Sequence, residues 1–261
     1  MNVVVLSHLD LAIASLLVIA LAALSWKQRL GLQQQLLIAA LRTVVQLGLI
    51  GLVLKALFED LHPAWLIPIS MLMVMAAGRE VIARQQRRLA GGYLVGTDAM
   101  FVSSFSITLL ALVVIVQPAP WYQPQYAIPL LGMMLGNTMT GIAVGMERLL
   151  KTVADDHERI EQRLMLGETP EVALSEPLRD AARAGMIPII NAMAAAGIVS
   201  LPGMMTGQIL AGAAPVEAVK YQILIMFMVT SGTGFGTLLA LKLSAKRLFD
   251  ERARLRLDRL L

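Results

Sequence analysis

The 261-residue chain contains no cysteine and only three histidines. The absence of cysteine excludes disulfide bonds, thiolate metal ligands and cysteine nucleophiles. His8, His62 and His157 all fall outside the long apolar runs, so a protease that works inside a membrane would lack its catalytic histidine. The sequence also lacks a Gly-x4-Gly-Lys-Ser/Thr string, the loop that usually holds ATP phosphates. We expect a chain that is not an enzyme and that binds no cofactor itself.

Charge is scarce as well, because charged residues make up 15% of the chain and apolar residues 57%. A soluble domain of this length could not bury so much apolar surface, so the composition predicts an integral membrane protein. A helix needs about 20 mostly apolar residues to cross a bilayer. Seven stretches qualify and predict an all-α, polytopic fold: Leu9–Trp26, Leu36–Phe58, Ala64–Ala83, Leu94–Gln117, Ala127–Met146, Met186–Leu201 and Val219–Leu241.

The basic residues predict the orientation of these seven stretches. Lys27 follows the first stretch, Arg87 follows the third, and further Lys and Arg residues recur in the tail from Lys242 to Arg259. The opposite connections are poor in basic residues, and Trp121 in one of them suits an interfacial aromatic belt. Because cytoplasmic loops are the basic ones, we place the N-terminus outside and the C-terminus in the cytoplasm. The tail suits anionic lipid headgroups, and we expect no nucleic-acid partner.

A cleaved signal peptide is an alternative interpretation of the first stretch. The segment Ala20-Leu-Ala22 resembles a small-residue cleavage site. No Lys or Arg precedes the apolar run, however, whereas Lys27 follows it. This arrangement favours a membrane helix that stays part of the chain.

One connection, residues 147–185, is long and charged, and the predicted orientation places it in the cytoplasm. Apolar residues at helical spacing continue the fifth stretch into it. Gly167 then suits a helix C-cap, and Thr169 and Pro170 suit the start of a new helix. We predict short helices that receive force from a partner, with an ordinary solvated loop as the alternative. The candidate contact residues are Glu161, Gly167, Thr169, Pro170, Glu171 and Arg179.

A ten-residue string occurs twice in outline. Gly132-Met-Met-Leu-Gly-Asn-Thr-Met-Thr-Gly141 and Gly203-Met-Met-Thr-Gly-Gln-Ile-Leu-Ala-Gly212 share three glycines and an amide side chain in register. Such a string is too polar for a surface that faces lipid, so it marks either a tight helix seam or a solute path. Valine at Gly136 or Gly207 is expected to wedge helices apart. The candidate residues are Gly132, Gly136, Asn137, Thr140, Gly141, Gly203, Gly207, Gln208 and Gly212.

These strings carry a family resemblance. The first string, Arg163-Leu-Met-Leu-Gly-Glu-Thr-Pro170, Pro188-Ile-Ile-Asn191 and the second string together resemble the FetB family of ABC transporter permeases. That family is linked to iron export in bacteria, and its plant relatives are half-transporter permeases tied to aluminium tolerance. The resemblance extends over most of the chain.

The resemblance implies one permease domain over residues 1–261, in the inner membrane of a bacterium. It also implies a homodimer that couples to separate cytoplasmic ATPase subunits, which bind ATP and Mg. Membrane subunits of ABC importers carry a Glu-Ala-Ala loop with a glycine six residues after the glutamate, a spacing that Glu161 and Gly167 share. Gln162 and Arg163 replace the two alanines, so only a coupling helix between Glu161 and Arg183 is carried over.

The substrate is less well specified by the residues. Iron prefers oxygen and imidazole ligands, and the predicted spans offer neutral amides and hydroxyls without histidine. No metal ligand is assigned on this basis. Iron export is the function that the resemblance implies, and an ABC permease for another metal or small solute is the first alternative. A secondary transporter is the second, but it would place a carboxylate or histidine deep in a span.

Overall fold

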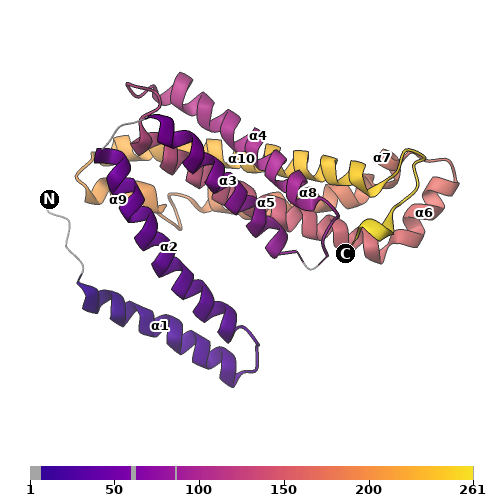
Figure 1. The fold of residues 1–261 in the computed structure, drawn as a ribbon, viewed down its shortest axis with the longest axis horizontal. Helices are drawn as coiled ribbons and strands as arrows, with labels where there is room; N and C mark the ends of the chain where they lie inside the picture. The colour runs from indigo at the N-terminus through magenta and orange to yellow at the C-terminus, as the bar shows by residue number, and fades with distance from the viewer. Residues whose placement is uncertain (1–6, 60–62, 86, 261) are drawn as a thin grey trace. The chain divides into compact units, whose positions relative to one another are not determined.

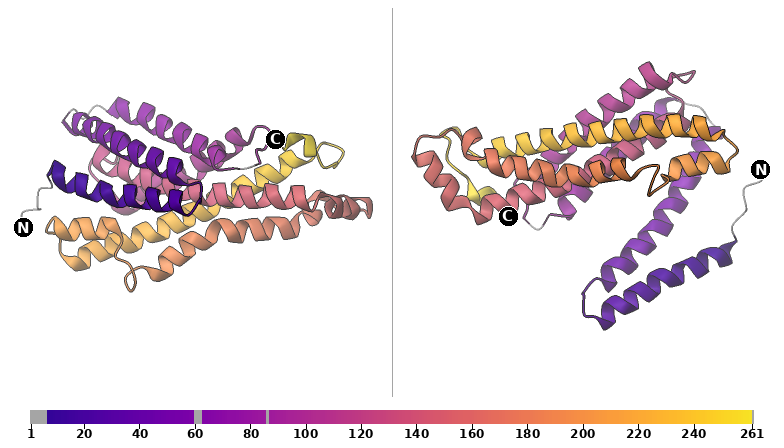
Figure 2. Two further views of the ribbon diagram at one scale, coloured as in Figure 1. Left: turned by 90° about the horizontal axis from the view of Figure 1, so that it is seen from below. Right: turned by 180° about the vertical axis from the view of Figure 1, so that it is seen from behind.

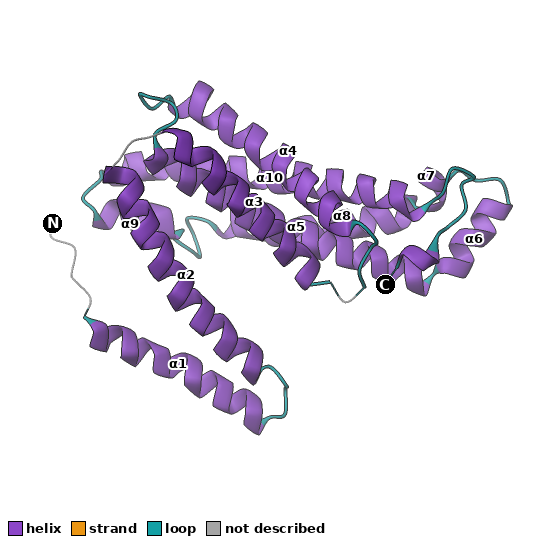
Figure 3. Cartoon of the chain, in the orientation of Figure 1, coloured by secondary structure: helices purple, strands orange, loops and turns teal. Residues whose placement is uncertain are grey.

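The structure, a computed structural model, describes residues 7–59, 63–85 and 87–260. The described residues form helices, turns and loops and no strand, which confirms the all-α prediction (Figure 3). The long helices are α1 (His8–Lys27), α2 (Gln33–Glu59), α3 (Leu66–Ala83), α4 (Gly92–Leu110), α5 (Pro124–Asp155), α8 (Ser175–Ala195) and α10 (Pro215–Leu248). The short ones are η1 (Pro63–Trp65), the π-helical η2 (Ala111–Val116), α6 (His157–Met165), α7 (Pro170–Ala173), α9 (Gly203–Leu210) and η3 (Leu257–Arg259).

Among the described residues, six helical segments are long and apolar enough to cross a membrane. They are α1, α2, α3, α4 with η2, α5 and α10, and they coincide with six of the seven predicted stretches. The chain is therefore a multi-pass membrane protein. The remaining predicted stretch, Met186–Leu201, is not one continuous helix, because α8 ends at Ala195 and α9 starts at Gly203 (Figure 2). The number of crossings and the orientation stay predictions.

The chain divides into two compact units. The first comprises residues 1–62 with 210–212, and it contains the α1–α2 hairpin. A capping box fixes the start of α1, since the backbone N–H of Ser7 donates to Asp10 Oδ2 at 2.8 Å and that of Asp10 donates to Ser7 Oγ at 3.3 Å. Most side chains of α1 and α2 are exposed, as expected for apolar helices that face lipid. The single permease domain over residues 1–261 stays a prediction.

The second unit, residues 63–209 and 213–261, is built around α5. Helices α3, α4, α8 and α10 all pack against it (Figure 1). At about 1.5 Å per residue, the 32 residues of α5 and the 34 residues of α10 reach about 48 and 51 Å. Both helices are thus longer than the roughly 30 Å of hydrocarbon in a bilayer, so part of each extends beyond it.

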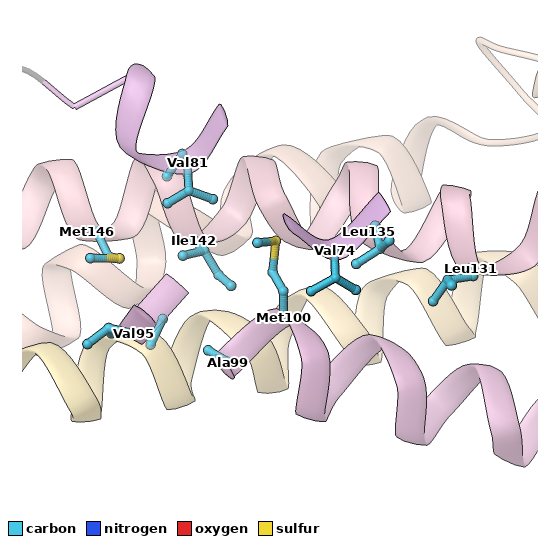
Figure 4. Packing of buried hydrophobic residues seen from close by; sticks show 11 residues of the cluster. Val74, Val81, Val95, Ala99, Met100, Leu131, Leu135, Ile142 and Met146 are labelled. Atoms are coloured by element: carbon cyan, nitrogen blue, oxygen red, sulfur yellow. The ribbon is translucent and has the colours of Figure 1, made fainter. Parts of the chain in front are cut away.

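Three buried apolar clusters follow one another along α5. Its first third contributes Leu130 and Met134, its middle Leu135 and Ile142, and its last third Leu149, Leu150 and Val153. Figure 4 shows the middle cluster, in which residues of α3, α4 and α5 interlock. Ile225 of α10 lies in the first cluster and Leu248 in the last, so α10 runs parallel to α5. Ala181 of α8 lies in the last cluster and Ile189 in the first, so α8 returns the chain in the opposite direction.

Candidate functional site

Glycines bring α5, α8 and α10 into close contact. A methyl group added to Gly141 on α5 would lie 2.6 Å from Thr233 Cγ2 and 2.7 Å from Thr237 Oγ1, both on α10. One added to Gly185 on α8 would lie 2.6 Å from the carbonyl oxygen of Gly141. These distances are too short for any side chain. Gly141, one of the predicted residues, therefore belongs to a helix seam.

A second contact joins α10 to α4 and α5. A methyl group on Gly232 would overlap Met134 Cε, and one on Gly236 would lie 2.5 Å from Thr138 Cγ2 and 2.7 Å from Ser103 Oγ. The glycine-rich run from Gly232 to Gly236 resembles a phosphate loop in sequence, but here it packs helices.

Sequence reasoning missed Gly145 and Gly185 as members of the seam. A methyl group on Gly145 would lie 3.1 Å from Thr237 Cγ2 and 3.3 Å from the carbonyl oxygen of Ala181. The signal was present, because Gly141 and Gly145 are four residues apart and so are Ala181 and Gly185. Small residues at that spacing are typical of close helix pairs in membranes.

The seam is polar as well as tight. The hydroxyl groups of Thr138, Thr233, Thr237 and Ser244 are buried, and within the described residues none has a hydrogen-bond partner. A buried hydroxyl without a partner costs about 1–3 kcal/mol on the scale of mutational data. Because the backbones and methyl groups are already in contact there, the seam leaves no passage for a solute between α5 and α8 at Gly141.

Three other predicted residues of the first string lie on a different face of α5, on which Gly136 and Asn137 are exposed and Thr140 is half-buried. Gly136, Asn137 and Thr140 are all outside the seam. Asn137 Nδ2 donates to the carbonyl oxygen of Met133 at 2.9 Å, and Thr140 Oγ1 donates to that of Gly136 at 3.1 Å. No atom lies within 4 Å of a methyl group built on Gly136, so valine there would wedge nothing apart within the chain. Gly136 faces outward, so the wedging expected there finds no neighbouring helix among the described residues, and its effect stays a prediction.

Gly132, at the start of the first string, contacts α3. A methyl group there would lie 3.3 Å from Met73 Cε, the end of a flexible side chain. The flexible Met73 side chain can move aside for a methyl group, so a substitution at Gly132 should disturb the packing less than one at Gly141.

The second string forms a different structure from the first. It begins at the first residue of α9 and ends in the turn after it, where Gly212 has a φ of +98°. Methyl groups on Gly203 and Gly207 would meet no atom within 4 Å, so the wedging expected at Gly207 likewise finds no neighbour among the described residues and stays a prediction. Gln208 is half-buried, and its Oε1 has no partner within the described part of the chain.

The predicted coupling segment forms a compact platform at the end of the second unit where α5 finishes (Figure 1). Leu166 is the C-cap of α6, and Gly167 follows it with a φ of +93° and donates its N–H to the carbonyl oxygen of Leu164 at 3.0 Å, so this glycine ends the helix one residue after the cap. Pro170 is the first residue of α7, as predicted. Thr169 occupies the N-cap position in extended backbone, without a side-chain hydrogen bond.

Ion pairs hold the platform together. Arg163 Nε lies 2.7 Å from Glu168 Oε2, and Arg163 Nη1 donates to the carbonyl oxygen of Ala173 at 3.0 Å. Arg159 on α6 pairs with Glu176 on α8. These contacts link α6 to α7 and α8, so the segment is an ordered element and not a loose loop.

The surface of the platform contains most of the predicted coupling residues. Glu161, Gly167, Thr169, Glu171 and Arg179 are exposed, and Pro170 is half-buried. Met165 and Leu166, which sequence reasoning did not select, are 79% and 85% exposed beside Gly167. Apolar side chains so far exposed on a charged segment outside the predicted spans suit contact with another protein.

A cavity of about 610 Å³ lies where α7 and α8 meet α10 and the tail. Its lining includes Pro170, Glu171, Phe249 and Asp250. The tail folds back beside it, because Asp250 Oδ1 accepts from the backbone N–H of Arg252 at 2.9 Å and that of Arg254 at 3.0 Å. The N–H of Arg254, together with its guanidinium group, lowers the pKa of Asp250 to about 2. Within the described ranges, no three Asp, Glu or His side chains converge as metal ligands would.

Comparison with known proteins identifies a family that covers most of the chain. Residues 8–249 match the uncharacterised protein family UPF0014. The chain is 43% identical over 213 residues to the UPF0014 membrane protein slr1647 of Synechocystis, covering 80% of this chain and 81% of that protein. It is 32% identical over 246 residues to the probable iron export permease protein FetB of Escherichia coli, covering 94% and 93%.

A plant protein is similar too. The chain is 33% identical over 216 residues to the protein ALUMINUM SENSITIVE 3 of Arabidopsis thaliana, covering 82% of this chain and 78% of the relative. No solved structure shows a significant match. The resemblance inferred from the glycine–methionine strings is thereby confirmed, and the chain belongs to the UPF0014 family of membrane proteins.

Proposed function

We propose that the chain is the permease subunit of an ABC transporter that exports iron across a bacterial inner membrane. The observation that carries the proposal is the similarity to a probable iron export permease over 94% of the chain. In this proposal two copies of the chain form the membrane part, and a separate cytoplasmic ATPase binds ATP and Mg and hydrolyses the nucleotide. The chain itself supplies the path and the coupling surface.

The platform supports the coupling part of the proposal. It presents the exposed Met165 and Leu166 beside Gly167. Arg163 pairs with Glu168, and Arg159 pairs with Glu176 of α8. Because α6 continues directly from α5 and α7 leads directly into α8, a push on the platform would move both helices that meet in the seam. Such a rigid connection is what transmission of force from an ATPase requires.

The test is ATP turnover by the purified complex of the chain with its co-expressed ATPase. We expect ferrous or ferric iron to stimulate turnover and other metal ions to stimulate it less. Stimulation by another metal or by a small organic solute, with none by iron, would favour a permease for that solute. Failure of any ATPase to copurify or crosslink with the platform would contradict the ABC assignment.

A further inference from the structure

The exposed face of α5 differs in chemistry from that of α10. On α10, the exposed side chains in the middle of the helix include Phe227, Phe235 and Leu238, which are 61%, 64% and 49% exposed, with the small Ser231 between the two phenylalanines. On α5, the corresponding part of the helix has Asn137 exposed and Thr140 half-buried. An amide that faces hydrocarbon costs several kcal/mol, on the order of the water-to-cyclohexane transfer of such a group. The α10 face suits lipid, whereas the α5 face requires water, a solute or protein.

The exposed face of α5 borders α8. Val144 of α5 and Ala184 of α8 line one cavity of about 360 Å³, together with Arg84, Glu147, Arg148 and Lys151. Thr140 and Asn137 follow one and two turns from Val144 along α5. Asn191 lies two turns after Ala184 on α8 and is exposed. Because α8 runs antiparallel to α5, a step from Ala184 to Asn191 leads in the same direction as a step from Val144 to Asn137. This α5–α8 flank extends from a charged cavity at the platform end toward the middle of the bundle, and on α8 the exposed apolar residues Ile187 and Pro188 lie between Ala184 and Asn191.

The α5–α8 flank ends at the break between α8 and α9. Helix α8 stops at Ala195, and Gly197 with a φ of +88° turns the chain before α9 starts at Gly203. Within the turn, the N–H of Gly197 donates to the carbonyl oxygen of Ser200 at 2.8 Å, and the N–H groups of Val199 and Ser200 donate to that of Ala195 at 3.0 and 3.2 Å. The turn thus satisfies these donors itself, and the exposed amides of Asn137 and Asn191 carry the argument for a path.

The hydrogen bonds decide which kind of group the flank offers. Asn137 Nδ2 donates a hydrogen bond to the carbonyl oxygen of Met133, and the hydroxyl group of Thr140 donates to the carbonyl oxygen of Gly136. What remains available is Oδ1 and the second N–H of the Asn137 amide, together with the lone pairs of Thr140 Oγ1, so both side chains offer an oxygen acceptor. Neutral oxygens of this kind coordinate hard cations or accept from the water around them, and they release a cation more readily than carboxylates do.

We propose that the α5–α8 flank, with Asn137, Thr140 and Asn191, lines the solute path and contacts a cation or its hydration water through neutral oxygens. The proposal rests on the proposed transport function and assigns residues to it. It separates two roles that the first glycine–methionine string combines: Gly141 packs the seam, and Asn137 and Thr140 face the path.

The chain is free of cysteine, so single cysteines can test the proposal directly. Asn137→Cys, Thr140→Cys and Asn191→Cys would be compared with Phe227→Cys and Phe235→Cys in membrane vesicles that contain the full chain and its ATPase. The probes are a cationic and an anionic methanethiosulfonate reagent, neither of which crosses the membrane. The cysteine thiolate attacks the reagent's sulfur and displaces methanesulfinate, and a thiol ionises only where water reaches it, so we expect path cysteines to react at least about tenfold faster than the α10 controls. We also expect the cationic reagent to react faster than the anionic one.

Equal, slow modification of all five cysteines would overturn the proposal, because the flank would then face lipid or be sealed by packing. Disulfide formation between two copies at Asn137→Cys without modification would overturn it as well, in favour of a dry dimer interface. Faster reaction with the anionic reagent would contradict the cation assignment. Fast modification that added iron does not slow would support the path and count against iron as its solute, which separates this proposal from the proposed function.

Discussion

Gly185 of α8 lies so close to Gly141 of α5 that a methyl group on Gly185 would come within 2.6 Å of the carbonyl oxygen of Gly141. Two backbones meet there with no side chain between them. The same methyl group would lie 2.8 Å from Thr237 Cγ2, so α10 closes the contact from a third direction. This point fixes the distance between the three helices that connect the platform to the middle of the bundle.

Gly185→Val should therefore destabilise the folded permease by more than the 1–3 kcal/mol typical of overpacking, because backbone and not a flexible side chain stands in the way. Gly136→Val is the matched control, since the same substitution on α5 meets open space. Thermal unfolding in detergent should show a clear drop in midpoint for Gly185→Val and little change for Gly136→Val. Equal midpoints for the two variants would mean that the seam is not closed as described.

The platform yields a prediction about the ATPase. Met165→Asp with Leu166→Asp should weaken copurification of the ATPase at least about tenfold, because each change removes apolar contact area and buries a charge in the interface. Both side chains are almost fully exposed in the chain, so its own stability should stay the same. Leu32→Asp, at another exposed apolar position, is the control. Unchanged copurification of the double variant would place the coupling surface elsewhere.

The orientation can be measured with the same cysteine-free background. Reporters or single cysteines at Lys27, Arg87 and Lys246 should react from the cytoplasmic side, and one at Trp121 from the outside. Helices α5 and α10 run in the same direction, so their starts must lie on the same side of the membrane. A cytoplasmic signal at Trp121 would refute the N-outside arrangement with seven crossings.

Asp250 makes the tail sensitive to acid. Its pKa in the folded chain, about 2, lies below the ordinary 3.8, so its contribution is complete above about pH 4 and is lost as the pH falls through 2. Hydrogen exchange of the backbone amides of Arg252 and Arg254 should stay slow at pH 5, and Asp250→Asn should make it fast at that pH. Equal exchange in both proteins would show that the carboxylate does not hold the turn.

Local patterns in the sequence predicted the features that depend on neighbouring residues. Six spans follow from apolar length alone, and the end of α6 follows from Gly167 and Pro170. The interruption after α8 escaped prediction because Ile198, Val199 and Leu201 are apolar and continue the run without a change in hydropathy. Gly197 and Pro202 flank it, but neither residue alone distinguishes a break from a kink.

The sequence alone also does not show which residues of the first string lie in the seam and which lie on the α5–α8 flank. Gly136 and Gly141 belong to the same sequence pattern, yet they face different directions on α5. Their roles depend on the partners across the contact, Thr233, Thr237 and Gly185, which are distant in sequence. A single sequence does not specify such pairings, because any small residue at helical spacing could form them.

Iron transport by the reconstituted complex tests the central claim most directly. Vesicles would contain the chain and its ATPase, with ATP and the platform on the same side of the membrane. We predict that iron moves away from the platform side only when ATP is hydrolysed, and that the ATPase without this permease moves none. Iron movement that is independent of ATP, or ATP-driven movement of another solute while iron stays in place, would contradict the account.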